Sequence, residues 1–189
     1  MMGVGELQQY RDQFAQVAGQ TRALINGLSE AQFNWRPGPG QWSIEECLGH
    51  LVIAGQRQLK LIEQAIADGR ARGLTGTDPF RYGLLERAFL RQMEPPVRRK
   101  FSAPRRLRPV HGQPLTAIVP TFLHLQNQLV RAAEAAEGLD LARVKVANPV
   151  FRFWKVSLGM TLATVAAHER RHLEQARRIL DHPQFPGRS

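Results

Sequence analysis

The chain has 189 residues, 43% of them hydrophobic, and its 26 Lys and Arg against 16 Asp and Glu give a net charge of +10. This length is enough to bury a core, so we expect a single folded domain over residues 1–189 rather than disorder. No apolar run is long enough to cross a bilayer, the N-terminus lacks the pattern of a secretory signal, and a lone cysteine excludes an internal disulfide. We therefore expect a cytoplasmic protein with no membrane partner; its positive charge favours anions without choosing among them.

The first two predicted helices flank a loop rich in Pro and Gly. Apolar side chains recur every three or four positions over residues 6–28, which predicts the first helix. The loop over residues 33–42 contains two tryptophans. Ser43 and Glu46 then have the spacing of a capping box, in which each side chain accepts a hydrogen bond from the backbone amide of the other residue. The second helix is therefore predicted over residues 44–69.

A long connection over residues 70–112 follows, and it contains many Pro and Gly residues. A short helix over residues 81–93 is predicted inside it, because apolar side chains cluster there. About 40 residues are far more than an antiparallel helical hairpin requires. This length is sufficient for a crossover that lets the second and third helices run parallel.

The end of this connection, Arg98–Arg108, is the most basic part of the chain. Its prolines favour a solvated loop, and it matches no nucleic-acid-binding fold. Recruitment of an anionic small substrate to the mouth of a pocket is the first alternative role, and phosphate tracking along nucleic acid is the second. We expect no nucleic-acid partner.

Two further amphipathic helices complete the predicted fold. The third runs from about residue 114 or 116 to Glu137 and is closed by Gly138, while Pro120 lies either in its first turn or at a kink. Residues 139–155 show no alternation that predicts a sheet. Ser157 can cap the fourth helix, which extends to Leu180. Four apolar stripes around one core predict an all-α four-helix bundle.

Two histidines lie within the apolar stripe of the fourth helix. His168 and His172 are four residues apart, so their Cβ atoms are about 5–6 Å apart on one helix face. His50 borders the apolar face of the second helix, so three imidazoles can converge. Three protein ligands with an open position are typical of a catalytic metal site. The alternative is that these histidines are polar members of the core, satisfied by hydrogen bonds.

The segment 168–172, His-Glu-Arg-Arg-His, also matches the H-E-x-x-H pattern of zinc proteases, in which the glutamate is the general base. The pattern is short, no third ligand follows it, and no sheet is predicted beside the helix. We therefore do not predict a protease.

Two segments resemble signatures of the DinB/YfiT-like superfamily. Residues 42–51, Trp-Ser-Ile-Glu-Glu-Cys-Leu-Gly-His-Leu, resemble its W-S-x-x-E-x-x-x-H-L signature. Residues 168–175, His-Glu-Arg-Arg-His-Leu-Glu-Gln, resemble its H-x-x-R-H-x-x-Q signature. The resemblance extends over about residues 5–181. It implies a four-helix bundle with a long crossover between the second and third helices.

The resemblance also implies a divalent metal cofactor, most often zinc or nickel, held by His50, His168 and His172. It implies a homodimer, because many members form one. Activities in the family include thiol S-transfer with a low-molecular-weight thiol and thiol-dependent isomerisation. We therefore expect a metal-dependent enzyme with a small-molecule substrate, in which the metal stabilises a thiolate. A hydrolase acting through bound water and a non-catalytic protein with structural histidines are the alternatives.

Five further side chains enter these expectations. Glu169 is a candidate catalytic base, although exposure on the flank of the helix is the favoured interpretation. Gln175, one turn beyond His172, is a candidate hydrogen-bond partner for a ligand histidine. Cys47 is interpreted as a buried small side chain, Arg171 as a residue that pairs across helices, and His124 as exposed.

Overall fold

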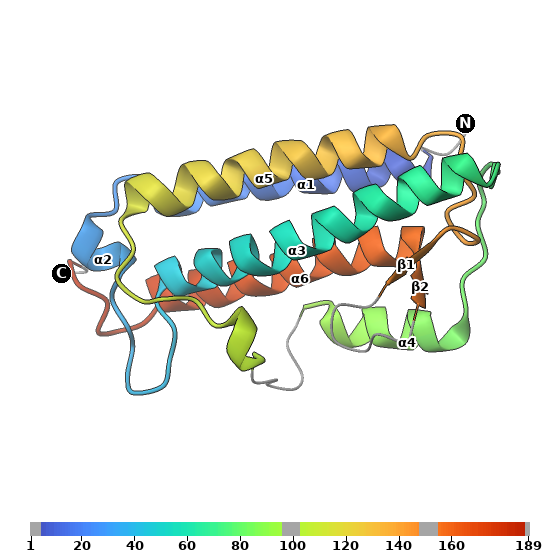
Figure 1. Ribbon diagram of the computed structural model, residues 1–189. Helices are drawn as coiled ribbons and strands as arrows, with labels where there is room; N and C mark the ends of the chain where they lie inside the picture. The colour runs from blue at the N-terminus through green and yellow to red at the C-terminus, as the bar shows by residue number, and fades with distance from the viewer. Residues whose placement is uncertain (1–4, 96–102, 148–154, 188–189) are drawn as a thin grey trace.

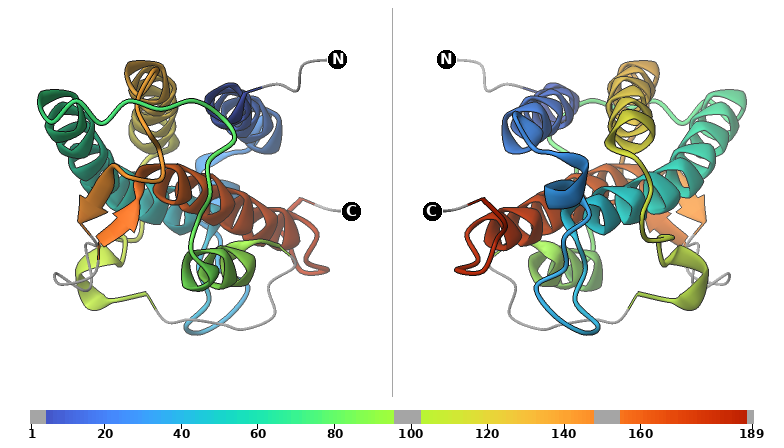
Figure 2. Two further views of the ribbon diagram at one scale, coloured as in Figure 1. Left: turned by 90° about the vertical axis from the view of Figure 1, so that its right-hand side faces the viewer. Right: turned by 90° about the vertical axis from the view of Figure 1, so that its left-hand side faces the viewer.

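The computed structural model describes residues 5–95, 103–147 and 155–187. Four long helices form a bundle in which α1 and α3 each pack against both α5 and α6. Figure 2 shows α5 between α1 and α3, with α6 on the opposite side of the bundle. The predicted all-α bundle is therefore confirmed (Figure 1). Its helices are α1 (Glu6–Ile25), α3 (Ile44–Ala71), α5 (Leu115–Ala135) and α6 (Leu158–Leu180).

Helices α3 and α5 run in the same direction and lie close together (Figure 1). Gly49 faces Ile118 and Gly55 faces Leu125, so contacts advance along both helices together. A Cβ atom added to Gly55 would lie 2.5 Å from Cδ2 of Leu125, which is too close for a larger side chain without a shift. The parallel arrangement predicted from the length of the connection is therefore present.

The crossover between α3 and α5 covers one side of the molecule. It contains α4 (Leu84–Met93), which packs on α6, and the short 3-10 helix η1 (Arg105–Leu107), which contacts α3 (Figure 1). Most of the basic run predicted before Arg105 lies outside the described residues. The described end of the crossover contacts the helix that carries His50, and this contact positions the site below.

The second helix begins with the capping box expected from the sequence, whereas Ser157 is the N-cap residue of α6 but its side chain makes no capping hydrogen bond. The Ser43 hydroxyl accepts from the Glu46 amide at 3.1 Å, and the Glu46 carboxylate accepts from the Ser43 amide at 2.9 Å. Gly138 follows α5 with φ +79°, a conformation that suits glycine. Pro120 is the sixth residue of α5 and therefore lies beyond its first turn, which was one of the two positions that the sequence allowed. A second capping box begins the short helix α2 (Glu30–Phe33), which the sequence analysis did not predict.

A small antiparallel ribbon corrects the expectation that residues 139–155 form no sheet. Strands β1 (Lys145–Ala147) and β2 (Lys155–Ser157) pair with Val146 opposite Val156. Each strand has three residues, too few for the alternation that predicts a strand from sequence. The ribbon leads directly into α6, so it fixes where that helix begins.

The buried apolar side chains form two clusters along the bundle. One contains Phe14, Leu125 and Leu162 near the β ribbon, and the other contains Phe33, Phe122 and Leu173 toward the C-terminus of α6. Between them α6 carries the buried polar side chains of Glu169, Arg171 and His172. None of the helices in the described parts of the chain combines the length and apolar character that a bilayer crossing requires.

Candidate metal centre

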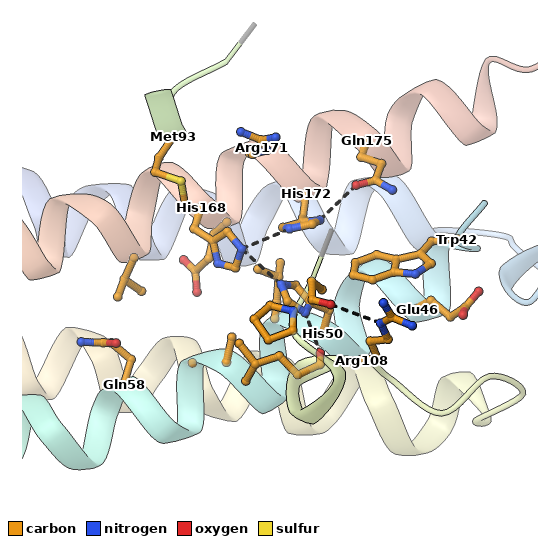
Figure 3. Close-up of a pocket in the computed structure, with 18 of the residues that line it drawn as sticks. Trp42, Glu46, His50, Gln58, Met93, Arg108, His168, Arg171, His172 and Gln175 are labelled. Carbon is orange, nitrogen blue, oxygen red and sulfur yellow. Dashed lines mark hydrogen bonds between the residues drawn. The ribbon is translucent and has the colours of Figure 1, made fainter. Parts of the chain in front are cut away.

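Three histidines from α3 and α6 converge at one point (Figure 3). Nε2 of His168 lies 3.2 Å from Nε2 of His50 and 3.1 Å from Nε2 of His172. All three potential ligand atoms lie within 4.8 Å of one another. The antiparallel packing of α3 on α6 brings His50 to the two histidines that are one turn apart on α6. The structure therefore brings together the three histidines singled out in the sequence.

The nitrogen separations fit a common metal ion. A zinc–nitrogen distance of about 2.0–2.1 Å with tetrahedral angles places two ligand nitrogens about 3.3–3.4 Å apart. The observed separations of 3.1 and 3.2 Å are close to this value. Three imidazole nitrogens with no carboxylate or thiolate suit zinc and nickel, and they leave further coordination positions for a ligand. The donor set therefore fits the divalent ion that the sequence led us to expect.

Hydrogen bonds fix the orientation of two of the three rings. His50 donates from Nδ1 to the backbone oxygen of Leu107 at 2.8 Å, and His172 donates from Nδ1 to Oε1 of Gln175 at 3.1 Å. A proton on Nδ1 leaves the lone pair of Nε2 free to bind a metal. Gln175 thus has the role expected for it. Leu107 belongs to the crossover, so a segment distant in sequence orients His50.

Burial keeps the three imidazoles neutral. Desolvation lowers the pKa of His168 to about 3, with a smaller contribution from the nearby His50 and Arg171 charges. Desolvation likewise lowers the pKa of His172 well below its ordinary value. It also lowers the pKa of His50, against the opposing hydrogen bond to Leu107. Neutral imidazole is the form that binds a metal, so the site is prepared for one at neutral pH.

Trp42 covers one side of the histidine cluster (Figure 3). Its ring stacks on His172 with centroids 5.7 Å apart and planes 24° apart, and its centroid lies 5.0 Å from that of His50. Trp42 directly precedes the capping box of α3, so the loop that starts the helix also supplies this contact. The indole limits the access of water to two of the three rings.

The end of the crossover is attached to the first turn of α3. The backbone amide of Gly112 donates to Glu45 at 3.3 Å, and Nδ1 of His111 lies 3.5 Å from Oε2 of Glu46. Glu46 also accepts two hydrogen bonds from Arg36, at 2.5 and 2.6 Å. Burial raises the pKa of Glu45 to about 7. These contacts hold the crossover in the position from which Leu107 reaches His50.

Glu169 is buried, which corrects the interpretation of this residue as an exposed flank position. Its side chain is 2% exposed, and Oε1 accepts from Nε2 of Gln126 on α5 at 2.8 Å. Oε2 has no hydrogen-bond partner among the described residues. Desolvation raises the pKa of Glu169 to about 8. A buried carboxyl beside a histidine cluster with a pKa near neutrality is typical of a functional site.

A cavity of about 1230 Å³ opens beside the histidines. Its walls come from the Trp42 loop, α3, α4, the crossover, the β ribbon and α6. Glu169 and all three histidines line it, whereas Cys47 does not. Cys47 is fully buried, and desolvation raises the pKa of its thiol. The cavity is large enough to hold one or two small molecules beside the cluster.

Arg171 and His124 lie where the sequence suggested, whereas two residues that support the site, Gln126 and Leu107, were not predicted. Arg171 is 8% exposed and donates to the backbone oxygen of Gln92 on α4, and His124 is exposed. The sequence analysis overlooked Gln126, a polar side chain four residues after Phe122 on the buried face of α5; this spacing is a signal that could have revealed it. Leu107 was also not predicted. It orients His50 through its backbone oxygen, so the identity of its side chain does not reveal this contact.

Comparison with known proteins identifies a family for this chain. The family model of the DinB superfamily matches residues 13–176, which include all three histidines. The uncharacterized protein YuaE of Bacillus subtilis (strain 168) is 26% identical over 156 residues, covering 82% of this chain and 87% of YuaE. No solved structure matches the chain.

Proposed function

The chain belongs to the DinB superfamily, and on that premise we propose that it is a metal-dependent enzyme that acts with a low-molecular-weight thiol. The observation that carries this proposal is the convergence of three neutral imidazoles on the wall of a cavity of about 1230 Å³. A structural metal site is normally closed by protein ligands, whereas an open wall leaves room for a substrate. The proposed ligands are His50, His168 and His172, and the proposed ion is zinc or nickel.

A divalent ion held by these nitrogens would supply a positive centre that lowers the pKa of a small thiol or of water. The protein contributes orientation and exclusion of water. Leu107 and Gln175 hold the rings of His50 and His172 with Nε2 directed at the common point. Trp42 covers the same two rings, so solvent access is reduced on that side.

Cys47 supports an external thiol rather than one supplied by the protein. It is the one cysteine of the sequence, it is fully buried, and it does not line the cavity. In the proposed transfer the sulfur of the substrate thiol forms a bond to a carbon electrophile and loses its proton. The leaving group departs with the electron pair of the bond that breaks. We propose that Glu169 accepts this proton near pH 8 and above, where its carboxyl is ionised; its Oε2 has no partner among the described residues.

The test is consumption of a small thiol with an electrophile, measured with metal-loaded and metal-free protein. The proposal predicts turnover in the loaded protein and its loss in His168→Ala, while the matched variant His124→Ala retains it because His124 is exposed and away from the cavity. Metal binding without turnover across a panel of thiols and electrophiles would contradict the thiol function. Folded protein that binds no metal would support the non-catalytic alternative.

Glu169 also favours a second candidate, a metal-dependent hydrolase on the same three histidines. Its burial and its pKa of about 8 suit a group that takes a proton from water. Under this alternative the loaded protein hydrolyses an ester or amide without added thiol. Glu169→Gln would then lower turnover by about 10²-fold or more. Dependence of turnover on thiol concentration separates the two candidates.

We also propose a homodimer, as the family resemblance implies. Leu84 and Leu85 on α4 are 81% and 77% exposed, which is unusual for large apolar side chains next to each other. Sedimentation equilibrium tests this. A monomer at micromolar concentration would contradict it.

A further inference from the structure

The histidine cluster divides the cavity into two sides of different chemistry. Figure 3 shows Trp42, Glu46, Arg108 and Gln175 on one side of the three histidines, with Gln58 and Met93 on the other. The antiparallel packing of α3 and α6 explains this division, because residues before His50 on α3 lie beside residues after His172 on α6. We call the first the arginine side and the second the apolar side.

The arginine side contains more arginines than carboxylates. Its arginines come from the Trp42 loop, the end of the crossover and α6, whereas Glu46 is the carboxylate that lines this side. The arginines are Arg36, Arg108 and Arg178. A cleft lined mainly by one sign of charge attracts small ions of the opposite sign.

The apolar side is lined by Ala54, Met93, Val156 and Val165 among others. Its charged members are already engaged or lie at the rim. Arg171 donates to the backbone of α4 and Glu169 accepts from Gln126, which leaves Arg57, exposed as Arg108 also is, as the charge at the rim of this side. This side therefore suits a reactant with an uncharged, largely apolar body.

Arg108 is the arginine that Figure 3 shows beside the histidine cluster on this side. Arg36 is bonded to Glu46, and Arg178 is paired with Glu174. Arg108 forms no ion pair with any described residue, and its hydrogen bond from Nε to the backbone oxygen of Ala103 leaves the two terminal nitrogens for a ligand. It also follows Leu107 directly, so the contact that orients His50 places Arg108 next to the cluster.

We propose that the thiol used by this protein carries an acidic group, which binds to Arg108 on the arginine side, while the uncharged electrophile occupies the apolar side. This inference rests on the proposed thiol function. A guanidinium binds a carboxylate or phosphate through two parallel hydrogen bonds, which fixes the orientation of the ligand as well as its affinity. The acidic group is held while the sulfur reaches the common point of the three Nε2 atoms.

The experiment uses cobalt(II)-loaded protein and two small thiols, mercaptosuccinate, which is anionic, and thioglycerol, which is uncharged. Binding is followed by the sulfur-to-cobalt charge-transfer absorption. The proteins are the wild type, Arg108→Gln and the matched control Arg105→Gln, which removes the same charge from an exposed position of η1 that does not line the cavity. We expect the wild type to bind mercaptosuccinate at least about tenfold more tightly than thioglycerol.

Arg108→Gln is expected to remove most of this preference without changing thioglycerol affinity, whereas Arg105→Gln retains the preference. Added salt should reduce the preference in the wild type, because screening weakens the attraction. Equal weakening in the two variants, or a preference that survives Arg108→Gln, would overturn the proposal.

Failure of the thiol function is distinguishable from failure of this inference. If neither thiol changes the absorption of protein that carries cobalt, the thiol function fails. The remaining claim, that Arg108 binds an acidic ligand, is then tested by calorimetric titration of zinc-loaded protein with succinate. The claim is supported if the wild type and Arg105→Gln bind succinate and Arg108→Gln does not. Any other result among the three proteins overturns the claim.

Discussion

The layer around Glu169 and the apolar clusters on either side of it belong to the same bundle but differ in chemistry. In the clusters, Phe14 and Phe122 are fully buried among other apolar side chains. In the layer between them, Glu169 and Gln126 are buried to a similar degree, and the hydrogen bond between them crosses from α6 to α5. Burial alone therefore does not separate the two regions.

The difference indicates which positions serve stability and which serve the site. A buried carboxyl and amide stabilise a fold less than well-packed apolar side chains of similar size. Two atoms of this layer, Oε1 of Gln126 and Oε2 of Glu169, have no hydrogen-bond partner among the described residues. A bundle selected for stability alone would place Leu at these positions. The polar layer is therefore the part of the core that function explains.

The largest expected effect on stability lies in the apolar clusters. Phe122→Ala removes a fully buried ring and is expected to lower the free energy of unfolding by about 3–5 kcal/mol. Urea denaturation measures this change. The metal content of the folded fraction should remain that of the wild type, because Phe122 does not line the cavity. Loss of metal from folded Phe122→Ala protein would show that the two regions are not separate.

In the polar layer, the Glu169 carboxyl should make the free energy of unfolding depend on pH. Burial raises the pKa of Glu169 in the folded protein from 4.5 to about 8, so the folded state holds a proton that the unfolded state releases. Stability of the metal-free protein should therefore fall as pH rises, by a total on the order of 5 kcal/mol, until the carboxyl ionises near pH 8.

The pH interval from 7 to 8 isolates this effect, because histidines are then mostly neutral in both states. Over that interval, urea denaturation should show a steeper negative slope in the wild type than in Glu169→Gln, where Glu45, with a pKa of about 7, accounts for the slope that remains. An equal slope in both proteins would mean that Glu169 is ionised in the folded state.

Within the site, Gln175 should affect metal affinity more than stability. Gln175→Leu removes the acceptor for Nδ1 of His172 and is expected to weaken metal affinity about 10- to 100-fold. Competition with a chromogenic chelator measures the affinity. The matched variant Gln56→Leu changes an exposed position of α3 away from the cavity and should have no effect on metal affinity. Equal affinity in the two variants would contradict the role of Gln175.

The smallest effect is expected at Cys47. Cys47→Ala removes one buried sulfur atom and should lower the free energy of unfolding by about 1 kcal/mol. Metal content and thiol turnover should not change, because Cys47 does not line the cavity. A large loss of metal in this variant would indicate that Cys47 rearranges to become a ligand.

The four long helices were predictable because periodicity and capping are local. The capping box of Ser43 and Glu46 and the glycine after α5 mark helix ends within a few residues of the positions observed. The histidine cluster was also predictable, since His168 and His172 share a helix face. Three-residue strands and a four-residue helix were missed, because so few residues carry no periodic signal.

The interactions that complete the site were harder to predict, because they join distant segments. The contact between Leu107 and His50 depends on the path of the crossover, which the sequence of that segment does not specify. Glu169 did carry a signal that was interpreted wrongly. It lies seven residues after Leu162 and four before Leu173, both buried, so helical spacing places it on the apolar face. Its charge led to the expectation of exposure.

The most direct test of the account is elemental analysis of protein purified without a chelating tag, comparing the wild type with His50→Ala, His168→Ala and the control His124→Ala. The account predicts about one equivalent of zinc or nickel per chain in the wild type and the control, and none in the other two, with all four proteins folded. Absence of metal from the wild type, even after reconstitution with zinc, nickel or manganese, would contradict the account. The three histidines would then be polar members of the core.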